Sequence, residues 1–173
     1  INTNIFDPIN LDLAIFNNEY YDMIEPSFDS FGDIIFKNLT RARIQGFEIV
    51  SSTKLFSENL SLKFGYNYLW AIDIENNEFL KYRPKNSIIG GIDFKKDFFE
   101  SGIDFRYLSR VEKIDNEFVD LGLVPDGGKR VEIFVIDARV GVNLFQINLP
   151  GRIFFNISNL LNYNYVELIG NLA

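Results

Sequence analysis

The ionisable side chains of this sequence narrow the chemistry that the chain can perform. Its 173 residues include no Cys and no His. Disulfide frameworks, thiolate or imidazole metal sites and histidine-based catalytic triads are therefore excluded within it. The net charge is −7 with interspersed signs, which provides no basic stripe of the kind that binds nucleic acid. The sequence predicts no enzyme, no metal site, no cofactor and no nucleic-acid partner.

Charged residues stand at every second position of several alternating segments. In residues 134–144 (FVIDARVGVNL), Asp137 and Arg139 alternate with an unbroken apolar row. Because successive side chains of a β-strand lie on opposite faces, one face of this segment meets water and the other meets a core or a lipid bilayer. Six residues are predicted to line such a wet face, where salt bridges and hydration are their ordinary role and ligand contact is the alternative. They are Glu48, Lys63, Asp93, Arg106, Asp137 and Arg139.

Alternation extends along most of the chain and predicts an all-β protein. In residues 60–70 (LSLKFGYNYLW) every second residue is apolar or aromatic. Strands of ~13 residues or more extend over ~40 Å, enough to cross a hydrocarbon layer at a tilt, whereas strands of ordinary domains have ~5–6 residues. We expect about seven long strands, at roughly 9–25, 34–55, 60–74, 82–95, 101–115, 130–145 and 151–161.

Two kinds of connection take turns between these segments. Short turns rich in Asp, Asn, Pro or Gly occur at FDPI (6–9), FSEN (56–59), KDFFE (96–100) and QINLPG (146–151). Longer connections lie between them, and the longest covers residues 114–129. Short periplasmic turns that alternate with longer extracellular loops are typical of outer-membrane barrels. The predicted fold is an antiparallel transmembrane β-barrel, and a soluble β-sandwich is the alternative.

The predicted number of strands indicates a part of a larger barrel. Bacterial barrels close with an even number of strands, because an open edge cannot be satisfied in lipid. Residues 1–5 (INTNI) have the pattern of the tail of an earlier strand, and residues 166–173 (VELIGNLA) have that of a loop with no returning strand. We therefore expect residues 1–173 to be an incomplete barrel fragment.

Three stretches resemble the C-terminal part of the barrel of TonB-dependent outer-membrane receptors. Residues 38–49 (NLTRARIQGFEI) resemble a strand motif of that family, residues 66–94 resemble a hairpin with a Leu-x-x-Arg-Pro motif, and residues 152–168 (RIFFNISNLLNYNYVEL) resemble its penultimate strand and loop. The matching positions are Asn38, Ala42, Ile44, Gly46, Glu48, Tyr66, Tyr68, Leu80, Arg83, Pro84, Asn159, Leu160, Asn162, Tyr165 and Glu167. The plug domain, the TonB box and the last strand of the family have no counterpart among these residues.

The resemblance implies an active transporter in the outer membrane of a Gram-negative bacterium. Such receptors take up scarce nutrients, most often ferric siderophores, or else cobalamin or glycans. The implied partners are outer-membrane lipid, a small-molecule ligand such as a siderophore, and the TonB energy complex, which acts through the missing N-terminal region. The alternatives are a small self-contained barrel that serves as porin, adhesin or structural anchor, and a barrel enzyme whose catalytic residues lie on other strands.

Aromatic residues near the predicted loops are the remaining candidates. Since loops carry specificity, we predict ligand-facing roles for Phe31, Phe79, Tyr82 and Phe118. Another four aromatic residues fit the girdle of rings at a membrane interface. These are Tyr66, Tyr68, Trp70 and Tyr107.

Overall fold

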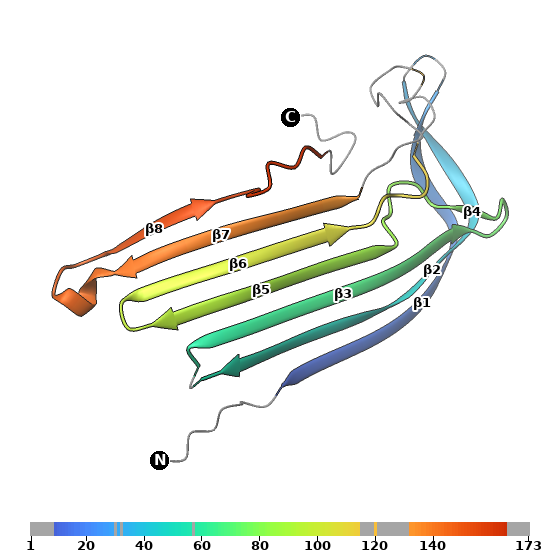
Figure 1. Cartoon of the computed structure of the whole chain (residues 1–173). Coiled ribbons are helices and arrows are strands. Elements are labelled where there is room, and N and C mark those ends of the chain that lie inside the picture. Colours follow the sequence, from blue (N-terminus) through green and yellow to red (C-terminus); the bar gives the residue numbers. More distant parts are fainter. Residues whose placement is uncertain are drawn as a thin grey trace.

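The computed structural model describes residues 9–29, 31, 33–56, 58–114, 120 and 132–165, and most of them form one antiparallel sheet (Figure 1). The strands lie in chain order, β1-β2-β3-β5-β6-β7-β8, and β4 pairs only with β3. The elements are β1 (Asn10–Phe28), β2 (Ile34–Leu55), β3 (Leu60–Asp73), β4 (Glu78–Phe79), β5 (Asn86–Lys96), β6 (Phe99–Leu108), β7 (Ile133–Asn143), the 3-10 helix η1 (Leu144–Ile147) and β8 (Arg152–Ile157). The predicted all-β antiparallel fold is confirmed.

The sheet is open within the described residues, with β1 and β8 at its two edges. In the same part of the chain, no helix is long and apolar enough to cross a membrane.

The register of the strands separates two faces. Paired residues of an antiparallel sheet share a face, and the pairs Lys63↔Gly91, Gly91↔Asp104 and Asp104↔Asp137 form one row across four strands. We call the side that carries this row the charged face. The opposite side, here called the apolar face, carries rows such as Leu62, Ile92, Ile103, Ala138 and Ile157.

Tight turns join neighbouring strands at one end of the sheet. β5 and β6 are joined through Asp97 and Phe98, where Lys96 pairs with Phe99 and Asp97 has a φ of 52°. Asp tolerates this left-handed conformation better than most residues, which suits it to the turn. The β7–β8 connection contains η1, whose end is marked by the left-handed Asn148 (φ 61°). The predicted turn at FDPI falls almost wholly outside the described residues.

Longer connections occupy the other end, and they correct some predicted strand limits. β5 begins at residue 86 rather than 82, because Tyr82 has a φ of 58° and Pro84 makes only an isolated bridge, to Val111. β6 ends at residue 108 rather than 115, since the residues that follow turn toward that connection: the Tyr82 N–H donates to the carbonyl of Lys113 at 2.9 Å. The two connections therefore lie side by side. Most of the predicted 114–129 loop lies outside the described residues.

A bend redirects the distal parts of β1 and β2, which rise from the sheet at the end with the longer connections (Figure 1). Asp22, within β1, has a φ of 54° and forms no pair in the register. Met23 and Leu39 lie just beyond it and pack against the cluster around the buried Leu80. The outer part of the β1–β2 hairpin is thus held against the connection that follows β4.

Candidate functional site

All six residues predicted for a wet face lie on the charged face. Lys63 and Asp137 belong to the row that defines it, and Asp93 and Arg139 belong to the next row through Gly102. Arg106 is two residues from Asp104 on β6, and Glu48 is reached through its pair with Asn67 on β3. Whether this face borders the lumen of a complete barrel stays a prediction.

Arg139 organises the charges on this face. It donates Nη2 to Asp93 on β5 and Nη1 to Asp104 on β6, and Lys63 Nζ lies 3.9 Å from Asp93 Oδ2. The side chains are one third to two thirds exposed, so each ion pair contributes at most about 1 kcal/mol. The network therefore links four strands, β3, β5, β6 and β7, with its charges partly exposed, and it is not a major source of stability.

Two further predicted residues contact the segment after β8. Arg106 Nη2 lies 3.4 Å from the Tyr165 hydroxyl, with its guanidinium 6.0 Å from the centre of that ring. Asp137 Oδ1 accepts a hydrogen bond from the Asn159 N–H at 2.7 Å. Residues 159–165 thus continue alongside β7 beyond the end of β8, where the Leu160 N–H donates to the carbonyl of Ile136 at 2.7 Å and the Arg106 side chain reaches across to Tyr165.

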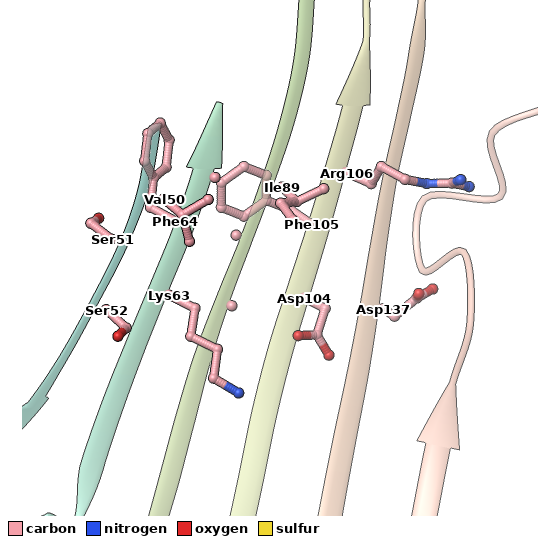
Figure 2. Close-up of a pocket in the computed structure, with 13 residues that line it drawn as sticks. Val50, Ser51, Ser52, Lys63, Phe64, Ile89, Asp104, Phe105, Arg106 and Asp137 are labelled. Carbon is pink, nitrogen blue, oxygen red and sulfur yellow. The ribbon is translucent and has the colours of Figure 1, made fainter. Parts of the chain in front are cut away.

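An open hollow of about 560 Å³ lies on the charged face (Figure 2). Val50 and Ile89 form its apolar part, Gly65 and Gly91 leave its floor without side chains, and Lys63 borders it. Asp104, Arg106 and Asp137 complete the polar border, each on β6 or β7 (Figure 2). The hollow suits a ligand or protein segment that offers both apolar and hydrogen-bonding groups.

Sequence reasoning missed Asp104 as a member of this site. Asp104 stands two residues before Arg106, so alternation alone assigns it to the same face. Glu48, in contrast, was predicted but makes no contact with the Arg139 network in the described structure. Its neighbour Asn67 has a buried Oδ1 without a hydrogen-bond partner among the described residues.

The apolar face is exposed rather than covered. Large side chains project from it on every long strand, which is the opposite of what a soluble sandwich requires. They include Leu11, Leu13, Ile15, Phe47, Phe64, Ile92, Phe99, Ile103, Phe134, Val140, Ile153, Phe155 and Ile157. A lipid environment accounts for this face, as expected of a barrel wall.

The predicted loop aromatics have different surroundings. Phe31 lies between β1 and β2 and is 88% exposed. Phe79 pairs with Ile72 and packs edge-on against Trp70, with ring centres 5.0 Å apart, so it lies on the apolar face beside the predicted girdle. Tyr82 is fixed within the connection after β4, and Phe118 lies outside the described residues. The ligand-facing role of the four aromatic residues stays a prediction.

Comparison with known proteins identifies the sheet. The family model for the TonB dependent receptor-like β-barrel matches residues 3–160. The copper transporter OprC is similar over 92% of this chain and 24% of its own, with 14% identity and a TM-score of 0.70. The siderophore receptor PirA from Acinetobacter baumannii is similar over 92% of this chain and 26% of its own, with 18% identity and a TM-score of 0.59.

The chain spans about a quarter of the length of each of these structures. No curated protein sequence matches it. At these identities the two structures show the fold alone, whereas the family model covers most of the chain. The sheet is therefore a segment of a transmembrane β-barrel, and the chain belongs to the TonB-dependent receptor-like β-barrel family.

Proposed function

We propose that this chain forms part of the barrel wall of a TonB-dependent transporter in the outer membrane of a Gram-negative bacterium. The observation that carries the proposal is the family match together with the two unlike faces of the sheet. The exposed apolar face suits contact with lipid, and the charged face suits a hydrated lumen. The wall supplies no catalytic step: ligand binds from outside, and the energy complex acts on the plug domain of the full-length receptor.

The proposed substrate is a scarce nutrient, with a ferric siderophore first, and cobalamin or a glycan as the other classes. The similar structures include a siderophore receptor and a copper transporter, which supports a metal-linked solute. For this chain, the charged border of the hollow and the loop residues Phe31 and Tyr82 are the proposed ligand-facing elements. Phe79 belongs to the proposed girdle instead.

The test is an uptake assay in a strain that lacks the gene for the full-length protein. We expect uptake of a radiolabelled ferric siderophore to fall to background, and to return with the wild-type gene only when the TonB energy complex is intact. Copper and cobalamin uptake are measured in parallel. Unchanged uptake of all three solutes would count against the proposed substrates.

The intact mass of the native polypeptide provides an independent control on the architecture. A plugged barrel of about 22 strands has several times the mass of this segment. A native mass close to the 20.0 kDa of these residues would instead favour the small self-contained barrel.

A further inference from the structure

Along β1 and β2, the apolar face changes from apolar to charged toward the end with the longer connections. Ile15 pairs with Phe47, and further along the same face of these two strands Glu19 lies opposite Arg43. In outer-membrane barrels the longer loops are extracellular. An outward-facing Arg costs about 2–4 kcal/mol at the bilayer midplane but only about 0–1 kcal/mol near the interface. This change of character therefore marks the depth of the lipid headgroups.

The charged part of this face is a compact cluster of Glu19, Arg41 and Arg43. Arg41 Nη2 and Nε lie 2.6 and 3.2 Å from Glu19 Oε2, and Arg43 donates Nε at 3.0 Å and Nη2 to Oε1. Two cations share one carboxylate, so the cluster has a net charge of +1. The Arg side chains are 42% and 36% exposed against 25% for Glu19. Within the described residues, no hydrogen bond uses Nη1 of either arginine.

Aromatic rings accompany the cations on this side of the sheet. The Arg41 guanidinium lies 5.6 Å from the centre of the Tyr21 ring, and the Tyr21 hydroxyl donates to Glu19 Oε2 at 3.2 Å. Further around the wall, Lys85 Nζ lies 5.0 Å from the Trp70 ring centre. Amphipathic rings next to cations are typical of the headgroup region, where the ring contacts acyl chains and the cation contacts headgroups.

We propose that Arg41 and Arg43 bind the phosphate of a phosphorylated lipid in the outer leaflet. Guanidinium groups match phosphate oxygens through paired N–H bonds, and the cluster keeps unused N–H groups and a net positive charge. Lipid rather than free phosphate is the occupant because the cluster borders the apolar part of the same face. Ile15, which is 89% exposed, belongs to this apolar surface, and the surface accommodates the acyl chains. The site lies on the outside of the wall and is separate from the proposed transport function.

The proposal is tested by native mass spectrometry of the full-length receptor in detergent, with phosphatidic acid and phosphatidylcholine of equal chain length. We expect wild type to retain phosphatidic acid preferentially. The double variant R41Q/R43Q should bind it at least about tenfold more weakly, since charge-assisted hydrogen bonds from both arginines are lost. E19Q should bind it more tightly, because the competing carboxylate is neutralised while both arginines remain. The matched control is K54Q/E58Q, which removes an exposed ion pair at the opposite end of β2.

The opposite responses of the two variants distinguish binding from a structural role. A purely structural cluster would lower stability in both variants without changing the preference between the two lipids, and that result would overturn the proposal. Displacement of phosphatidic acid from wild type by an equal concentration of inorganic phosphate would overturn the assignment to lipid. R41K/R43K keeps the charge without the paired N–H geometry, so it should recover only part of the preference.

Discussion

Gly46 and Gly65 lie on the charged face of neighbouring strands, but the space beside them differs. A Cβ at Gly46 would lie 2.0 Å from the backbone oxygen of Tyr68 and 2.9 Å from the Phe16 ring. A Cβ at Gly65 would lie 2.8 Å from Cγ1 of Ile89, a side chain that can change rotamer. Backbone in a sheet cannot retreat without breaking pairs on both sides, so Gly46 permits a close approach of β2 and β3.

We expect Gly46→Ala to lower the free energy of unfolding by about 1–3 kcal/mol, the usual cost of overpacking. Gly65→Ala should cost less, because Ile89 is exposed and adjusts. Urea titration of the refolded full-length barrel, followed by the shift between folded and unfolded bands on a gel, measures both. Equal losses in the two variants would contradict this explanation.

At the same scale, the sequence predicted which face a charge occupies but not its partners. Alternation placed Arg139 and Asp93 correctly on one face. It could not show that Arg139 spans to Asp104, because that contact depends on the register between strands. Register is set by turn lengths and cross-strand packing, which a single strand's pattern does not contain.

At the scale of elements, the bend at Asp22 determines the direction of the β1–β2 hairpin. Beyond it, Glu25 Oε1 lies 2.8 Å from Arg83 Nη1, with the Glu25 side chain only 13% exposed. Lys81 Nζ donates to the buried Ser27 hydroxyl at 3.0 Å. These contacts attach the hairpin to the connection after β4, but they form only if the strand turns at Asp22.

Substitution of Asp22 tests the bend. We expect Asp22→Gly to change stability by less than about 1 kcal/mol, because Gly adopts a positive φ freely. Asp22→Val should cost about 1–3 kcal/mol, since a β-branched residue is strained there. Limited proteolysis of residues 23–39 in the folded receptor provides the readout. Equal protection in both variants would show that the hairpin contacts alone hold the bend.

The limits of the strands were predicted well where turns are short and less well where connections are long. β2 was predicted at 34–55 and is found at Ile34–Leu55. Its neighbour β1 includes Pro26 and ends at Phe28, three residues beyond the predicted 25. Pro26 lies in this extension, beyond the bend at Asp22, where it is opposite Phe36 of β2.

At the scale of the whole molecule, the two faces should be distinguishable in every strand. The chain has no Cys, so single nitroxide labels can be introduced into a full-length receptor freed of other cysteines. We expect labels at Ile15 and Phe155 to collide mainly with oxygen dissolved in lipid. Labels at the adjacent Ala14 and Asn156 should collide mainly with a water-soluble nickel chelate. If the two labels of each neighbouring pair collided equally with oxygen and with the nickel chelate, the assignment of the apolar face to lipid would be contradicted.

The order of the strands also bears on how the sheet assembles. Every long strand pairs with its neighbour in the chain, so most steps of assembly close a short loop, at a small cost in loop-closure entropy. The connection between β6 and β7, residues 109–132, is the longest. Pairing β7 with β6 therefore carries the largest loop-closure cost among the described strands, and because that cost rises only by about 0.6 kcal/mol for each doubling of loop length, the sheet tolerates a long connection there.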